Sequence, residues 1–174
     1  HLDIGRSTIY KHLSTLHQNH YLTKEGEIYY IGLKFLNFGR HARNRRPAQG
    51  LADEAVRELT ERTNEEVNFV VEEHGRIVTV EHSYHSNNEF AKADHLERPR
   101  ERSDNGSYFY MHNTGAGKAI LAEFSSREVD KVVDQWGLPK ATENTITDRE
   151  TLSAELDSIR EQGYAVDDEE YIMG

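Results

Sequence analysis

Hydrophobic positions at the start of the chain follow first a helical and then a strand pattern. Ile9, Leu13 and Leu16 have the spacing of one helical face, which predicts a helix with a buried apolar stripe. Two short segments rich in tyrosine and isoleucine then flank Gly26, and this pattern predicts a β-hairpin. Helical spacing resumes after the hairpin and gives way to a basic segment before Pro47, where we place a domain boundary.

The pattern after this proline predicts a second region of mixed α/β structure. Its first helix is expected to bury a face made of Leu51, Ala55, Val56 and Leu59. Apolar residues alternate with polar ones on both sides of His74 and Gly75, which predicts a hairpin with a two-residue turn. Residues 84–107 are rich in charge and are expected to form a long loop or an irregular strand.

Two capping-box patterns predict helices in the last third of the chain. They run from Ser125 to Glu128 and from Thr147 to Glu150. The two helices are expected to end at Gly137 and Gly163, since glycine is favoured just past a helix C-terminus. Residues 164–166 are expected to begin a strand that leads into an acidic segment.

Charge separates the start of the chain from the remainder. Residues 1–46 contain 8 Lys and Arg against 3 Asp and Glu, whereas the remainder contains 13 against 28. A small cationic segment joined to a larger anionic one suggests local contact with a polyanion. The acidic excess is typical of proteins from high-salt organisms, but ordinary acidic composition explains it equally well.

One face of the predicted first helix carries side chains of the types that contact phosphates and base edges. The candidate DNA-binding residues on and beside this face are Arg6, Ser7, Thr8, Tyr10, Lys11 and Ser14. Helix followed by hairpin is the order of a winged helix-turn-helix, although an amphipathic helix beside an unrelated hairpin has the same pattern. Arg43, Arg45 and Arg46 are further candidates for phosphate contacts, or they form a solvated helix end.

A glycine-rich turn in residues 112–122 is the densest chemical signal in the second region. Gly115 and Gly117 permit close approach to the backbone, and free N–H groups at a helix start attract carboxylates or phosphates. The spacing is not that of a P-loop, and Ala119 stands where a Mg²⁺-binding hydroxyl is needed. Tight helix packing explains the same glycines as well as a ligand site does.

Taken together, these motifs resemble the IclR-type transcriptional regulators. Residues 2–16 are similar to that family's recognition helix, with Lys11 where arginine is common, and residues 26–39 resemble its wing. Residues 112–122 and 160–174 resemble its effector domain. The resemblance implies an α+β chain in three parts. These are a partial winged helix-turn-helix (residues 1–32), a linker helix (33–47) and a GAF/profilin-like α/β effector-binding domain (48–174), a fragment truncated at both ends.

The resemblance also implies a function and a set of partners. The expected protein is a cytoplasmic regulator without cofactor or membrane segment, a homodimer or homotetramer on pseudo-palindromic double-stranded DNA. Its affinity for that DNA would be controlled by a small-molecule effector, expected to be an organic or aromatic acid. By resemblance the effector site includes Gly115, Ala116 and Asp167, with further positions expected beyond Gly174. The acidic segment around Asp167 is equally typical of a solvated surface.

Two other functions compete with regulation. Ten histidines raise the question of a metal-dependent enzyme, and His82 and His85 are the closest pair. Their spacing is not the helical i, i+4 pair of metal sites, cysteine is absent, and no nucleophile–base pair is visible, so we assign no catalytic or metal-binding residue. The other alternative is a ligand-binding or oligomerisation module without DNA binding.

Overall fold

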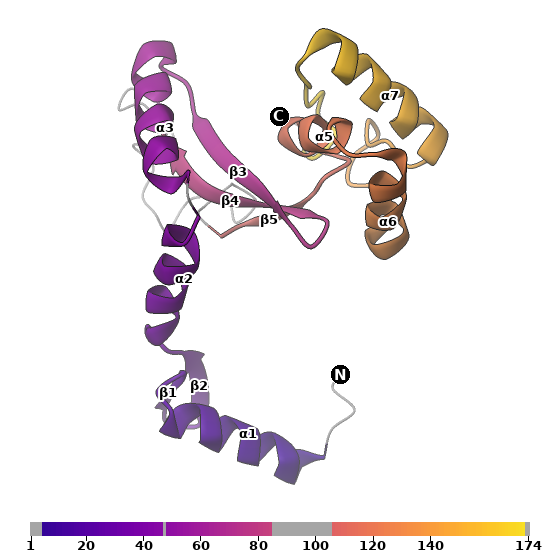
Figure 1. Cartoon of the computed structure of the whole chain (residues 1–174). Coiled ribbons are helices and arrows are strands. Elements are labelled where there is room, and N and C mark those ends of the chain that lie inside the picture. The colour runs from indigo at the N-terminus through magenta and orange to yellow at the C-terminus, as the bar shows by residue number, and fades with distance from the viewer. Residues whose placement is uncertain (1–4, 47, 85–105, 173–174) are drawn as a thin grey trace. The chain divides into compact units, whose positions relative to one another are not determined.

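The computed structural model describes residues 5–46, 48–84 and 106–172. The chain divides into two compact units, unit 1 (residues 1–50) and unit 2 (residues 51–174). In unit 1 a helix is followed by a hairpin and a second helix (Figure 1). These elements are α1 (Arg6–Gln18), β1 (Leu22–Glu25), β2 (Ile28–Ile31) and α2 (Lys34–Asn44).

The hairpin of unit 1 has the predicted form. Strands β1 and β2 pair antiparallel, with Glu25 opposite Ile28, and Gly26 takes the positive φ of 59° that the tight turn requires. Beyond it, Tyr21 stacks on Phe38 of α2 with ring centroids 5.8 Å apart. This aromatic contact connects the base of the hairpin to α2.

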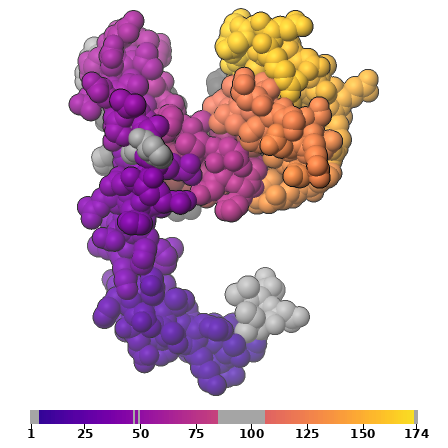
Figure 2. Space-filling view, in the orientation of Figure 1, coloured from indigo at the N-terminus to yellow at the C-terminus, as the bar shows by residue number. Residues whose placement is uncertain are grey.

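The apolar stripe of α1 is less buried than the sequence pattern predicts. Ile9 and Leu13 are half-buried, Leu16 is 40% exposed, and neither α1 nor α2 contains a buried residue. The side chains of α1 and α2 accordingly form much of the surface of unit 1 (Figure 2). The prediction of a buried stripe is therefore wrong for the described residues, because two helices and a two-stranded hairpin are too few elements to enclose a core.

Among the described residues from Gln49 onwards, a helix and a hairpin come first, and a short strand and three helices follow. The elements are α3 (Gln49–Thr63), β3 (Val67–Glu73), β4 (Arg76–Ser83), β5 (Tyr108–Tyr110), α5 (Gly115–Ala122), α6 (Ser126–Trp136) and α7 (Arg149–Gln162). The described strands form an antiparallel sheet in the order β3-β4-β5. The two-residue turn between β3 and β4 is confirmed, since His74 and Gly75 both have positive φ and Glu73 pairs with Arg76. Strand β5 was not predicted.

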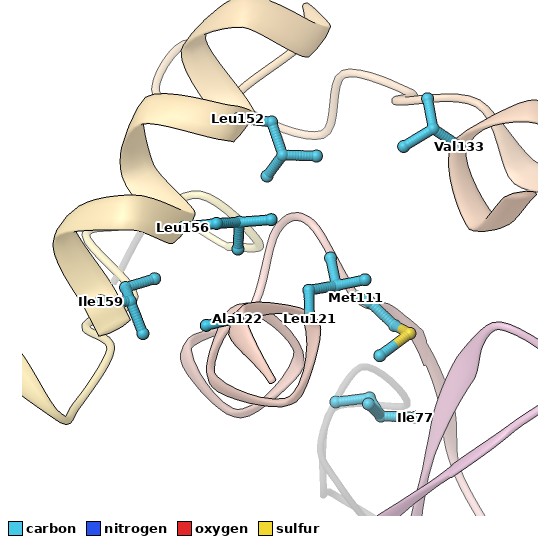
Figure 3. Close-up of a cluster of buried hydrophobic side chains, with 8 residues drawn as sticks. All are labelled: Ile77, Met111, Leu121, Ala122, Val133, Leu152, Leu156 and Ile159. Carbon is cyan, nitrogen blue, oxygen red and sulfur yellow. The ribbon is translucent and has the colours of Figure 1, made fainter. Parts of the chain in front are cut away.

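The core of unit 2 lies between the sheet and the three later helices. Helix α7 contributes three buried residues, and the cluster as a whole contains Ile77, Met111, Leu121, Ala122, Val133, Leu152, Leu156 and Ile159 (Figure 3). The α7 side chains point towards α5, which carries Leu121 and Ala122 (Figure 3). Helix α5 is therefore held on one side by α7 and on another by β4, which makes its position well defined.

Helix α3 buries a different face from the one that the pattern predicts. Ala52, Val56 and Thr60 are buried, whereas Leu51 is 73% and Leu59 44% exposed. Thr60 is tolerated in this position because its hydroxyl donates to the carbonyl of Val56 at 2.8 Å, which satisfies the buried polar group. The prediction is right for Val56 and wrong for its companions, because a small alanine and a threonine with an internal hydrogen bond carry little hydrophobic signal in the sequence.

Helix ends in the last third of the chain follow the predicted chemistry with one shift. The capping box of Ser125 and Glu128 is confirmed. The second helix is capped instead by Asp148, whose side chain accepts the N–H of Thr151 at 2.8 Å, so the predicted box starting at Thr147 is wrong by one residue. Gly163 ends this helix at φ 82°, and the segment after it forms no strand among the described residues, contrary to expectation.

Candidate functional site

The first turn of α5 follows directly from the glycine-rich sequence. Thr114 is the N-cap in extended conformation, and its Oγ1 accepts the N–H of Gly117 at 3.2 Å. The N–H groups of Gly115 and Ala116 have no acceptor among the described residues, as is normal for the first two positions of a helix. Ala116 is exposed. Two donors at a helix start are thus available to an anionic or carbonyl group.

The structure brings Gly115 and Asp167 together, although 52 positions separate them in the sequence. A Cβ atom on Gly115 would lie 3.2 Å from the backbone nitrogen of Asp167 and 3.4 Å from the carbonyl oxygen of Ala165. A side chain at position 115 would therefore push against the segment that carries Asp167. The three residues named as an effector site by resemblance lie at one place in unit 2.

Gly117 has a different role from the one that its sequence context suggests. A Cβ atom there would lie 2.4 Å from the carbonyl oxygen of Met111, closer than real Cβ contacts. Gly117 itself is buried. The expectation that Gly117 lets a ligand approach the backbone is wrong, because the space next to it is filled by the chain just before the helix.

The segment from Asp167 to Glu170 is held in place by many hydrogen bonds. Asp167 Oδ1 accepts the N–H of Glu170 at 2.9 Å. A neighbouring turn binds three successive carbonyls of the segment, through Thr142 to Glu169 (2.6 Å), Asn144 to Asp168 (2.8 Å) and Thr145 to Glu170 (2.7 Å). Glu169 has a positive φ of 58°, a conformation that surrounding contacts must maintain in a non-glycine residue. The exposed Asp167 side chain is therefore presented by an ordered loop.

Lys118 is a central residue of this region that sequence reasoning missed. It is 2% exposed, and its Nζ donates to Glu170 Oε1 at 2.7 Å and to Glu155 Oε1 at 3.0 Å. Burial lowers the pKa of Lys118, but the hydrogen bonds and negative charges of Glu170 and Glu155 outweigh it, so the pKa lies above its usual value and the amine stays charged. A lysine inside the otherwise small and apolar sequence of α5 was the available signal.

The acidic segment is therefore not simply a solvated surface. Glu170 is 5% exposed, whereas Asp167, Asp168 and Glu169 are exposed. Burial raises the pKa of Glu170; the hydrogen bond and the charge of Lys118 act in the opposite direction, and the negative charge of Asp167 adds to the rise. The alternative of a solvated surface is wrong for Glu170 and consistent with the exposure of the other three residues.

His112 lies just before the glycine turn and is buried. It is 3% exposed, and its Nε2 lies 3.2 Å from the carbonyl oxygen of Pro139. Burial lowers the pKa of His112; the bond to Pro139 raises it, and the positive charge of Arg76 lowers it further. A buried, neutral imidazole with a backbone partner is a packing element rather than a group that a ligand reaches.

In unit 1 the predicted DNA-facing residues of α1 are all at the surface. The exposed residues are Arg6, Ser7, Thr8, Tyr10, Lys11 and Ser14. Ile9 and Leu13, on the other side of the helix, are half-buried. The polar face is therefore available to a partner. His17, one turn further on, instead packs edge-on against Tyr29 of the hairpin at 6.3 Å.

The three arginines at the end of α2 differ in exposure. Arg45, the C-cap residue, is exposed, whereas Arg43 and Arg46 are half-buried. Arg45 is thus the best placed of the three for contact with a phosphate. Arg43 lies in the last turn of α2 and the other two follow it, and positive charge at a helix C-terminus also suits the helix dipole.

Features expected of a metal enzyme do not come together in the described part of the chain. There, no group of three or more His, Asp or Glu residues is arranged to hold a metal ion. His82 packs edge-on against Tyr84 at 5.4 Å. His85, its predicted companion, lies outside the described residues, as does most of the charged segment 84–107.

None of the described helices is both long enough and apolar enough to cross a membrane.

Comparison with known proteins identifies relatives over both units. Residues 44–174 match the family described as bacterial transcriptional regulator IclR C-terminal. The HTH-type transcriptional regulator KdgR of Escherichia coli K12 is 31% identical over 173 residues, which cover 98% of this chain and 62% of KdgR. The crystal structure of Thermotoga maritima IclR is similar with a TM-score of 0.72 and 25% identity, over 99% of this chain and 66% of that one.

A third similarity concerns a domain solved with a ligand. The inducer-binding domain of the transcription factor PobR from Acinetobacter, a double mutant in complex with 3-hydroxybenzoic acid, has a TM-score of 0.60 and 24% identity. The similarity covers 72% of this chain and 68% of that domain. These relatives are regulators of transcription, not enzymes, and the α+β fold of unit 2 matches their effector domains. The present chain spans about three fifths of the length of KdgR (62%).

Proposed function

The chain belongs to the IclR family of bacterial transcriptional regulators, and on this premise we propose that it is a sequence-specific DNA-binding regulator controlled by a small-molecule effector. One observation carries most weight. The similarity to an HTH-type regulator covers 98% of the chain and so extends over unit 1 as well as unit 2. A DNA-binding regulator that is controlled by an effector needs both a part that binds DNA and a part that senses a ligand.

Unit 1 is proposed to act as part of a winged helix-turn-helix. Helix α1 would enter the major groove, with Arg6, Ser7, Thr8, Tyr10 and Ser14 directed at base edges and Lys11 at a phosphate. Arg45, with Arg43 and Arg46, would contribute phosphate contacts from the end of α2. The exposure of the α1 face and the positive charge of residues 1–46 support this assignment.

Unit 2 is proposed to bind the effector at the start of α5. The free N–H groups of Gly115 and Ala116 suit a carboxylate or carbonyl oxygen, and the carboxylate of Asp167 suits a hydroxyl group or a protonated acid. A small hydroxy acid offers both groups in one molecule. The compound bound to the PobR domain, 3-hydroxybenzoic acid, has this combination, which supports an organic or aromatic acid as the class of effector.

Control of transcription would follow from coupling between the two sites. A homodimer, or a homotetramer built from dimers, would place two α1 helices in successive major grooves of a pseudo-palindromic operator. An effector that binds one arrangement of the subunits more tightly changes the population that fits the operator. Such coupling free energies are typically about 1–3 kcal/mol, or about 5–150-fold in affinity.

The proposed function is tested by titrating the protein expressed from its complete gene onto DNA from upstream of that gene. Fluorescence anisotropy over a salt series, with a scrambled duplex as control, separates specific from non-specific binding. Specific binding of at least about a thousandfold over the scramble, with a steep salt dependence, is expected. Addition of 3-hydroxybenzoate and of simple aliphatic hydroxy acids then tests the effector class.

Equal and weak binding to both duplexes, repeated with further promoters, would contradict DNA regulation. It would instead favour a ligand-binding or oligomerisation module. Specific DNA binding that no acid alters would leave the DNA-binding role in place and contradict the proposed effector class.

A further inference from the structure

The buried charge of Lys118 is an unusual feature for the centre of a short helix. Burial of an ammonium group is costly unless partner charges and hydrogen bonds compensate for it. Here the two partners come from distant parts of the chain, Glu155 in α7 and Glu170 after it. An apolar side chain would pack into α5 without this cost, so the position calls for a reason beyond stability.

The two carboxylates depend on Lys118 to different degrees. The side chain of Glu155 is 34% exposed and can be hydrated without its partner, whereas that of Glu170 is 7% exposed. The second oxygen of Glu170, Oε2, is buried and has no hydrogen-bond partner among the described residues. The ionised form of Glu170 is therefore maintained mainly by Lys118.

Contacts from Glu170 lead back to the first turn of α5. The N–H of Glu170 donates to Asp167 Oδ1 at 2.9 Å, and the backbone of Asp167 lies against Gly115, three residues before Lys118 in the same helix. The contacts therefore form a closed path from Lys118 to Glu170, to Asp167, to Gly115 and back along α5. Only one oxygen of Asp167 is used in this path, so the other remains available to a ligand.

We propose that Lys118 is a positioning residue, which through its ion pair with Glu170 sets the Asp167 carboxylate against the first turn of α5. Its importance for effector binding rests on the proposed function, whereas its effect on the loop does not. Thr142, Asn144 and Thr145 also hold the loop, but they donate to its backbone carbonyls and belong to a turn outside α5. Within the described path, Lys118 is the α5 side chain that binds the loop directly.

The experiment compares local amide hydrogen exchange and melting temperature in four proteins. These are the wild-type chain, Lys118→Met, the double variant Lys118→Met/Glu170→Gln, and Glu155→Gln as a matched control. Lys118→Met leaves Glu170 buried and without its partner, so its melting temperature is expected to fall. The double variant carries no unpaired buried charge and is expected to recover most of that loss.

Local exchange distinguishes positioning from stability. In the double variant, the hydrogen-bonded amides of Glu170 and Gly117 are expected to exchange about tenfold faster than in the wild type, while the amides of α7 do not change. Glu155→Gln is expected to stay within about twofold, because Glu155 is outside the path to Asp167. Recovery of the melting temperature without recovery of local protection would support the positioning role.

Three results would overturn the assignment. If the double variant is stable and its loop amides exchange at the wild-type rate, the Thr142–Thr145 turn is sufficient to position the loop without Lys118. Failure of the double variant to fold would mean that the ion pair serves the whole unit rather than the loop. An equal local effect of Glu155→Gln would mean that the loop has no special connection to Lys118. Since no DNA or effector is present, failure of the proposed function leaves this result interpretable.

Discussion

The two units of this chain differ in how far their side chains are buried. In unit 1 neither helix has a buried residue, and the chemistry lies on an exposed face of a single helix. In unit 2 an apolar cluster encloses α5, and the candidate site is assembled from the start of that helix and a loop 52 positions later. Substitutions are therefore expected to act mainly on binding in unit 1, and on stability and binding together in unit 2.

This contrast agrees with the kinds of partner proposed for each unit. A duplex is large and is met by a surface, so its contacts need exposure and charge rather than enclosure. A small acid is held by a few groups that must be fixed relative to one another before it binds.

The largest difference is expected between apolar truncations in the two units. Leu156→Ala in α7, where Leu156 is 1% exposed, should lower the free energy of unfolding by about 2–5 kcal/mol through the cavity that it leaves. Leu16→Ala in α1, where the leucine is 40% exposed, should cost less than about 1 kcal/mol. Urea unfolding followed by circular dichroism measures both. Equal losses would contradict the view that unit 1 has no enclosed core.

Glycine substitutions provide the next test. Gly117→Ala places a Cβ 2.4 Å from the Met111 carbonyl oxygen and should destabilise unit 2 by about 1–3 kcal/mol. Gly39→Ala in α2 meets nothing within 4 Å and should be neutral or stabilising by up to about 1 kcal/mol. Thermal unfolding of both variants is the measurement. A neutral Gly117→Ala would reopen the space beside position 117 for a ligand.

Charge removal on the exposed face of α1 should affect binding without affecting stability. Lys11→Ala is expected to weaken binding to all duplexes alike and to reduce the slope of log affinity against log salt by about 1. Lys131→Ala, an exposed lysine of α6 in unit 2, serves as the control and should leave the slope unchanged. An unchanged slope for Lys11→Ala would remove this residue from the phosphate contacts.

The smallest expected effect is a pH dependence in unit 2. Burial lowers the pKa of His112 below its usual 6.5, so the folded state favours the neutral ring. The corresponding stability is fully present above pH 6.5 and is lost as the pH falls through the lowered pKa. When the pH is lowered from about 7.5 to about 5, the melting temperature of His112→Gln should therefore fall less than that of the wild type. Parallel losses in the two proteins would show that His112 does not contribute to the pH dependence.

Most predictions that rest on a local signal are confirmed, and the Thr147 capping box is an exception by one residue. The Gly26 and His74–Gly75 turns and the Ser125 capping box were confirmed, because each depends on a few adjacent residues. The predicted face of α3 is right only for Val56, because the other buried positions hold an alanine and a threonine with an internal hydrogen bond rather than leucines. Strand β5 was missed since three residues carry too little periodicity to be recognised.

For the candidate site, too, some features could be predicted from the sequence and others could not. Gly115, Ala116 and Asp167 were named from motifs by resemblance, yet nothing in the sequence spacing places Asp167 beside Gly115. The role of Gly117 and that of Lys118 depend on which groups surround them, Met111 in one case and Glu170 in the other. Those neighbours are known only once the chain is folded.

The amino-acid sequence alone is enough to give the charge division, the polar face of α1, the Gly26 and His74–Gly75 turns, the Ser125 cap and the family to which the motifs point. These properties depend on residues within a turn or two of one another, where backbone geometry alone decides which side chains share a face. The burial of Glu170, its pairing with Lys118 and the contact of Asp167 with the start of α5 follow only from the folded chain. Contacts between distant segments depend on how helices and sheet pack, and packing is a property of the whole fold.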